Sequence, residues 1–163
     1  ASLMEAARWA PSSFNEQPWR FVLARKDQDP EAHAHILELL SEGNQRWAGR
    51  APILLVGAVS THFAKTGNPN RHARHDLGQA LALMTIQATS MGIFVHQMAG
   101  FDAARAEEVL GIPEGFEAVT AVALGRPGDP ALLPEGLRKK ETAPRTRRPQ
   151  DEFVFSGRWP EQT

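Results

Sequence analysis

Residues 7–21 read A-R-W-A-P-S-S-F-N-E-Q-P-W-R-F, and this stretch says more about the fold than any other part of the 163-residue chain. Pro11 and Pro18 bracket a polar loop of hydroxyl and amide side chains. Proline fixes φ, removes a backbone donor and disfavours helix at the preceding residue. We therefore expect a helix that ends near Ala10, a stiff and extended loop, and then a strand. Such a loop could hold a polar, flat ligand, although an ordinary turn has the same composition.

Composition narrows the classes of function. The net charge of −1 argues against a nucleic-acid or membrane-surface partner. The chain has no cysteine, which excludes disulfides, thiol nucleophiles and thiolate metal sites. No apolar run approaches the ~20 residues that cross a membrane, and we expect a soluble, cytoplasmic protein.

Sequence patterns predict alternating helices and strands. The expected helices span residues 1–9, 30–40, 45–49, 74–91 and 102–110, and the expected strands span 19–24, 52–59, 93–96 and 118–124. Asp29 followed by Pro30 is typical of a helix start, and Gly43 is expected to close that helix. The run 52–59 is continuously apolar, which predicts a strand covered on both faces.

The helix over 74–91 is apolar nearly all round, which predicts burial on all sides. Gly78, Ala82 and Thr85 give it a strip of small residues that permits close approach of another helix. After Gly125 the chain becomes rich in Gly, Pro and charge, with one strand-like piece at 153–155. We expect a single domain over 1–163, with a core over 1–125 and an extended arm over 126–163.

The sequence contains no motif typical of serine hydrolases, of phosphate-binding loops or of zinc proteases. A zinc site could be drawn from His62, His72 and His75, but a polar helix start explains them as well. The segment 138–148 holds six cationic residues against one glutamate, a local charge of +5. A solvated tail is the ordinary interpretation, and a phosphate anchor is the sharper one, because guanidinium groups match phosphate oxygens.

The motif P-S-S-x-N-x-Q-P-W resembles the signature of the FMN-dependent nitroreductase family. Four further stretches occur in that family's order: N-Q-R-W-A-G-R-A-P at 44–52, H-D-L-G-Q-A through H-Q-M-A-G-F-D at 75–102, L-G-I-P at 110–113 and A-P-R-T-R-R-P-Q-D-E-F-V-F at 143–155. The resemblance implies an α+β, three-layer α/β/α fold with a mostly antiparallel mixed sheet and a central buried helix. It also implies a homodimer in which the C-terminal tail embraces the partner subunit, with FMN at the interface.

The resemblance further implies which residues bind the cofactor. The loop that reaches the flavin held mainly by the partner subunit corresponds to Pro11, Ser12, Ser13 and Asn15. A residue that bonds the isoalloxazine edge corresponds to Asn44, which could instead be a helix N-cap. Backbone N–H groups that approach N5 and O4 correspond to Gln97, Met98, Ala99 and Gly100, where a missing Cβ lets the chain come close to a flat ring. The phosphate and ribityl contacts correspond to Arg145 and Arg147.

The family's activity is ping-pong transfer of hydride from NAD(P)H through FMN to a flat acceptor such as a nitroaromatic or quinone, with no catalytic side chain and no metal. The alternatives are a dehalogenase-like or flavin-degrading enzyme and a non-catalytic flavin-binding relative. The family pattern also includes an amino-terminal Arg-x-Ser-x-Arg element that grips the phosphate, and it does not occur from Ala1 onward. Either the segment that carries this element lies outside the given sequence, or the chain is a variant that binds FMN weakly or differently.

Overall fold

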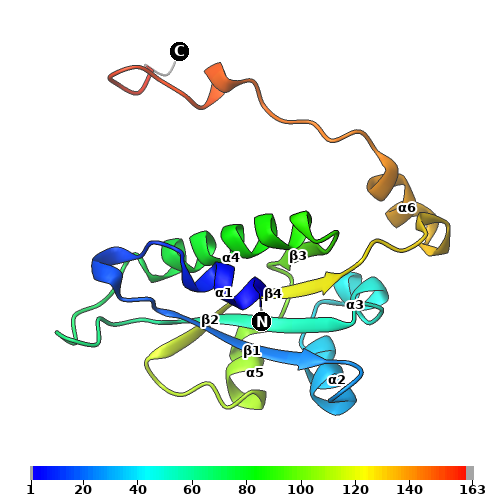
Figure 1. The fold of residues 1–163 in the computed structure, drawn as a ribbon, viewed down its shortest axis with the longest axis horizontal. Helices are drawn as coiled ribbons and strands as arrows, with labels where there is room; N and C mark the ends of the chain where they lie inside the picture. The colour runs from blue at the N-terminus through cyan, green and yellow to red at the C-terminus, as the bar shows by residue number, and fades with distance from the viewer. Residues whose placement is uncertain (1, 161–163) are drawn as a thin grey trace. The chain divides into compact units, whose positions relative to one another are not determined.

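A computed structural model describes residues 2–160 and divides the chain into two units, Ala1–Pro127 and Gly128–Thr163. The first unit is built on a four-stranded sheet with the order β1-β2-β4-β3 (Figure 1). The strands are β1 (Trp19–Arg25), β2 (Ile53–Ser60), β3 (Phe94–Met98) and β4 (Phe116–Gly125). All neighbouring pairs are antiparallel, so the expected α+β class is confirmed, while the expected parallel component of the sheet is wrong for the described residues.

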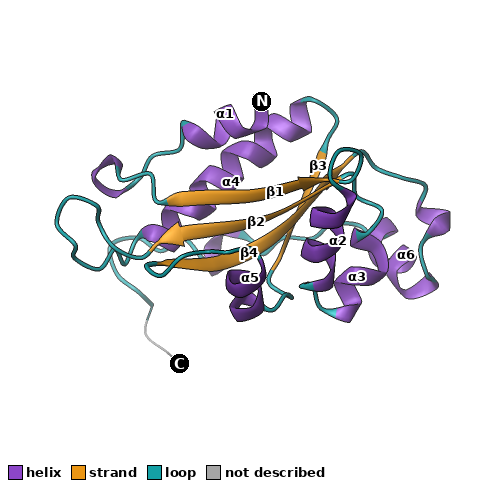
Figure 2. Ribbon diagram, turned by 90° about the horizontal axis from the view of Figure 1, so that it is seen from below, coloured by secondary structure: helices purple, strands orange, loops and turns teal. Residues whose placement is uncertain are grey.

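Helices cover both faces of this sheet, which confirms the three-layer arrangement (Figure 2). One face carries α1 (Ser2–Arg8) and α4 (Ala73–Ser90), and the other carries α2 (Pro30–Glu38), α3 (Glu42–Ala48) and α5 (Ala103–Val109). The alternation along β2 follows from these two layers. Leu55 and Val59 pack toward α1 and α4, while Leu54 and Val56 pack toward the opposite layer. Because both faces of β2 are covered, its sequence is apolar at consecutive positions and does not alternate with polar residues.

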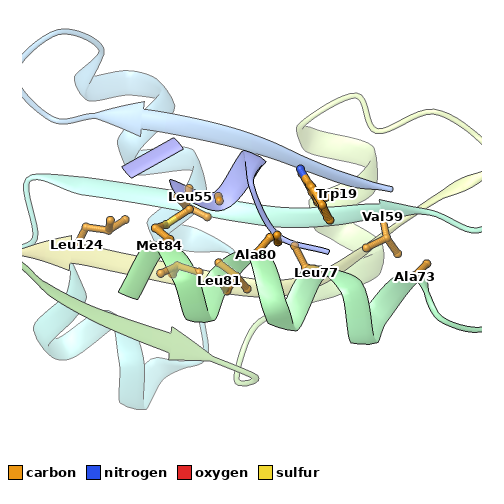
Figure 3. Close-up of a cluster of buried hydrophobic side chains, with 12 residues drawn as sticks. Trp19, Leu55, Val59, Ala73, Leu77, Ala80, Leu81, Met84 and Leu124 are labelled. Carbon is orange, nitrogen blue, oxygen red and sulfur yellow. The ribbon is translucent and has the colours of Figure 1, made fainter. Parts of the chain in front are cut away.

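The centre of the first hydrophobic core lies between α4 and the sheet (Figure 3). Leu77, Leu81 and Met84 of α4 are each no more than 1% exposed and pack with Leu55 and other apolar side chains. Burial of these apolar side chains away from water stabilises the fold.

The expectation that α4 is buried on all sides is wrong for the single chain. Gly78 and Ala82 are exposed, and Ile86 is 67% exposed. One face of the helix therefore remains uncovered, and it is the face that carries the small residues.

The segment before α2 follows its sequence signals closely. The Asp29 carboxylate accepts a hydrogen bond from Ala32 N at 2.9 Å, and Pro30 occupies the first turn. The expected stop at Gly43 is wrong, because α2 ends at Glu38 and Gly43 lies inside α3. Gly92, in contrast, follows α4 with φ of +67°, the left-handed conformation expected after a helix end.

The second unit contains α6 (Glu135–Thr142) and short 3-10 turns at Pro130–Leu132 and Gln150–Glu152. None of residues 128–160 is buried, so this unit has no hydrophobic core of its own. The strand expected over 153–155 is wrong, since these residues follow a 3-10 turn and pair with no strand in the described chain. Phe155 instead meets Trp159 edge to face, with ring centroids 5.1 Å apart. In the described chain no helix is long and apolar enough to cross a membrane.

Candidate functional site

The polar loop between the two prolines is tightly turned, so the expectation of an extended loop is wrong. Ser13–Asn15 forms a 3-10 turn, and Phe14, Asn15 and Gln17 have φ values of +53°, +56° and +50°. A positive φ is uncommon outside glycine, and such strain persists only where surrounding contacts impose it. Three such residues within four positions mark this loop as a candidate binding element.

Three hydrogen bonds impose this shape. Asp76, in the first turn of α4, accepts from Ser13 N at 3.0 Å, and it is only 2% exposed. The Ser12 hydroxyl oxygen accepts from Gln17 N at 2.9 Å. The Glu16 carboxylate accepts from Ala64 N at 2.7 Å, which ties the loop to the segment 61–70.

These contacts leave several polar groups of the loop available to a ligand. Ser13 is half-buried, and its hydroxyl has no hydrogen-bond partner among residues 2–160. Asn15 is exposed, and its side-chain oxygen accepts only a 3.2 Å bond from Gln17 Nε2. Phe14 is 92% exposed and meets Phe63 edge to face, with centroids 5.8 Å apart. Pro11 is exposed at the entrance of the loop.

A second group of predicted site residues lies where β3 ends and α3 begins. Gln97 and Ala99 are exposed, whereas Met98 is 3% exposed and its side chain belongs to the core beneath α2, α3 and α5. Met98 can therefore contribute only backbone atoms to a ligand. Asn44 donates from Nδ2 to Gly100 O at 3.0 Å, so these two predicted residues are brought into direct contact.

Within one chain the two groups stay apart. The loop over 11–18 leads into β1, and residues 97–100 leave β3, which are the two edges of the sheet. Three inter-strand spacings of ~4.8 Å separate these edges, roughly 14 Å. A ligand that contacts both groups of one chain would have to span this separation.

The predicted phosphate ligands lie in the second unit. Arg145 and Arg147 are both exposed, and neither forms an ion pair within the described part of the chain. Arg147 Nη1 donates to the carbonyl of Thr146 at 2.7 Å. Arg148 lies 3.9 Å from Glu152, which leaves Arg145 and Arg147 as the unpaired cations of this motif.

The histidines considered for zinc do not gather into a site. His72 and His75 meet edge to face at 6.4 Å, and residues 2–160 contain no cluster of three metal-ligating side chains. His96, next to the predicted flavin loop, packs against Trp47 of α3 with ring centroids 4.6 Å apart.

A cavity of about 340 Å³ lies beside the start of α4 and is lined by Thr61, Pro69, Asn70, Arg71, Ala73, Arg74 and Glu117. Arg74 and Glu117 form a two-pronged ion pair there, with N–O distances of 2.6 and 2.9 Å. Hydrogen bonding to this guanidinium lowers the pKa of Glu117 below its ordinary value.

Sequence reasoning did not predict that Asp76 and Glu16 hold the shape of the loop over 11–18. For Asp76 a signal existed, because an acid interrupts the apolar stripe formed by Ala73 and Ala80. For Glu16, no local pattern could have indicated a bond to a backbone amide 48 residues away.

Comparison with known proteins shows which protein family the chain belongs to. The model of the nitroreductase family matches residues 1–126, and the chain belongs to this family. A solved structure described as an oxidoreductase containing FMN is 37% identical, with a TM-score of 0.92 over 98% of this chain and 81% of that one. A nitroreductase family protein from Streptococcus pneumoniae TIGR4 is 21% identical, with a TM-score of 0.74 over 94% of this chain and 86% of that one, and supports the fold alone.

Two of the relatives of this chain come from Mycolicibacterium smegmatis and Thermus thermophilus. An uncharacterised 15.4 kDa protein in the ask 5′ region of Mycolicibacterium smegmatis is 34% identical, with 86% of this chain and 97% of that protein covered. A protein of Thermus thermophilus named NADH dehydrogenase is 28% identical, with 78% of this chain and 75% of that protein covered.

Proposed function

We propose that this protein is an FMN-dependent oxidoreductase that uses NAD(P)H to reduce a flat acceptor such as a nitroaromatic or a quinone. The likeness to an oxidoreductase containing FMN, at 37% identity over 98% of the chain, is the observation that carries the proposal. The relative named NADH dehydrogenase supports a reduced nicotinamide as the electron donor. When bound, FMN would supply the redox chemistry, accepting hydride from the nicotinamide and passing electrons to the acceptor in ping-pong order.

The residues present fit such a cofactor. Ala99 and Gly100 offer N–H groups with no acceptor within residues 2–160, on a turn next to Asn44. Arg145 and Arg147 are unpaired cations suited to phosphate oxygens. Gln97 and Met98 precede this turn, and their backbone would set the direction in which the N–H groups of the turn point. These groups bind and orient, and the proposal assigns no proton transfer to any side chain.

We further propose that the active form is a homodimer with FMN at the subunit interface. In this dimer a second copy supplies the loop of Pro11, Ser12, Ser13 and Asn15, which within one chain lies at the opposite sheet edge from Gly100. The uncovered face of α4, with exposed Gly78, Ala82 and Ile86, offers a surface where another helix can approach closely. We expect the arm over 126–163 to embrace the partner subunit in the same assembly.

Removing the phosphate ligands tests the cofactor assignment. In Arg145→Ala/Arg147→Ala, loss of two charge-assisted bonds of about 1.5–3 kcal/mol each weakens FMN binding by at least about 100-fold. The matched control is Lys139→Ala/Lys140→Ala, which removes the same charge from α6, where Lys139 pairs with Glu135 at 2.8 Å. Flavin fluorescence gives the dissociation constant, and analytical ultracentrifugation checks that the dimer persists. Equal affinity for FMN in both double variants would contradict the assignment of Arg145 and Arg147 as ligands of the FMN phosphate.

A further inference from the structure

The carbonyl oxygen of Gly100 receives two hydrogen bonds from the start of α3. Ser41 N donates to it at 2.9 Å, and Asn44 Nδ2 donates at 3.0 Å. A carbonyl oxygen can only accept, so the Asn44 side chain must direct its nitrogen toward Gly100. Its own oxygen is then the end that remains for other contacts.

A side chain at position 100 would collide with the two residues that make this contact. A Cβ there would lie 2.8 Å from Ser41 Oγ and 2.9 Å from Asn44 Nδ2, closer than real Cβ atoms come to other atoms. Gly100 does not have a positive φ, so clearance, and not backbone conformation, explains the glycine. The expectation that the missing Cβ serves the approach of a flat ring therefore needs correction, because Ser41 and Asn44 occupy the space.

A third hydrogen bond links the peptide group that contains Gly100 O to the preceding peptide group. Phe101 N, which belongs to the same peptide as Gly100 O, donates to Ala99 O at 3.0 Å. In a planar trans peptide the C=O and N–H groups point in opposite directions. With Ala99 O turned toward Phe101, the N–H of Gly100 points away from Phe101, and it meets no acceptor among residues 2–160.

We infer that Ser41 and Asn44 form a clamp that aims and polarises the Gly100 N–H for an acceptor atom on the flavin. Hydrogen bonds in series strengthen one another, so two donors at Gly100 O make the N–H at the far end of the chain a better donor. Asn44 is then a positioning residue that acts through Gly100. This inference rests on the proposed function, because it needs FMN as the acceptor.

The clamp itself can be tested in the apoprotein by NMR. Asn44→Asp keeps the shape of the side chain but places an oxygen against Gly100 O. We expect the Phe101 amide to exchange with solvent about tenfold faster, the effect of losing about 1.4 kcal/mol. The Gly100 amide proton should shift upfield.

Gln45→Ala is the matched control, since Gln45 Nε2 donates to a different carbonyl, Leu40 O, at 2.7 Å. It should leave both amides of the Gly100 turn unchanged. Unchanged Phe101 and Gly100 amides in Asn44→Asp would overturn the clamp.

A double-mutant cycle on FMN affinity tests the action through Gly100. Asn44→Ala and Gly100→Ala should each weaken FMN binding about tenfold. The double variant should also bind about tenfold more weakly, because both changes disrupt the same contact between Asn44 and Gly100. A hundredfold loss in the double variant would mean that Asn44 and Gly100 act independently, and would overturn the inference. If the wild-type protein bound no FMN, the proposed function would fail, while the amide measurements would still decide whether the clamp exists.

Discussion

The buried carboxylate of Asp76 provides the sharpest prediction about the loop that carries the signature motif. It is 2% exposed and accepts from Ser13 N at 3.0 Å, while its second contact, to His75 Nδ1, is long at 3.4 Å. In Asp76→Ala the Ser13 N–H loses its acceptor, and the strained turn that follows loses an anchor.

The magnitude follows from three effects. A hydrogen bond to a charged group contributes about 1.5–3 kcal/mol, and a negative charge in the first turn of α4 contributes roughly 0.3–1 kcal/mol. Removing a buried carboxylate also relieves part of its desolvation cost. We expect the free energy of unfolding to fall by about 2 kcal/mol in Asp76→Ala and by about 1 kcal/mol in Asp76→Asn, which keeps one acceptor oxygen.

Urea denaturation followed by tryptophan fluorescence measures this change, since Trp19 directly follows the loop and is 8% exposed. Ser13→Ala is the matched control, because it keeps the backbone N–H that Asp76 binds, and it should change stability by less than about 0.5 kcal/mol. Wild-type stability in Asp76→Ala would refute the idea that this carboxylate holds the loop.

Three smaller predictions follow from the contacts described above. Met84→Ala, at a side chain with 0% exposure, should lower the free energy of unfolding by about 2–5 kcal/mol in urea denaturation. Arg74 lowers the pKa of Glu117, so the stability gained from this pair is present above the ordinary value of 4.5 and is lost as the pH falls below it. Because Arg74 is largely exposed, the difference in unfolding free energy between wild type and Glu117→Gln should be only about 0.5 kcal/mol smaller at pH 3 than at pH 7. An equal difference at the two pH values would contradict the pairing. Glu16→Ala should speed amide exchange at Ala64, measured by NMR, since that N–H donates to the Glu16 carboxylate at 2.7 Å.

Elements with strong local signals were predictable from the sequence. Asp29 and Pro30 marked the start of α2 because capping depends on residues within one turn. The apolar run of β2 predicted a strand covered on both faces because its length and β-branched residues favour that state.

Features that depend on distant contacts were not predictable. The turned shape of the loop at Phe14 is imposed by Asp76, which lies 63 residues from Ser13 in sequence. Gly43 was mistaken for a helix end because glycine also occurs inside short helices whose packing outweighs its low propensity. The reason for a glycine at position 100 was not predictable either, since the side chains that need its clearance come from α3. Sequence similarity identified the family, but local patterns could not show which contacts hold its loops.

The most direct test of the account is a visible absorbance spectrum of the purified protein after addition of FMN and desalting, followed by anaerobic addition of NADH or NADPH. The account predicts flavin bands that stay with the protein and bleach when the reduced nicotinamide is added. A protein that retains no flavin, or retains flavin that no nicotinamide bleaches, would contradict the proposed FMN-dependent reductase.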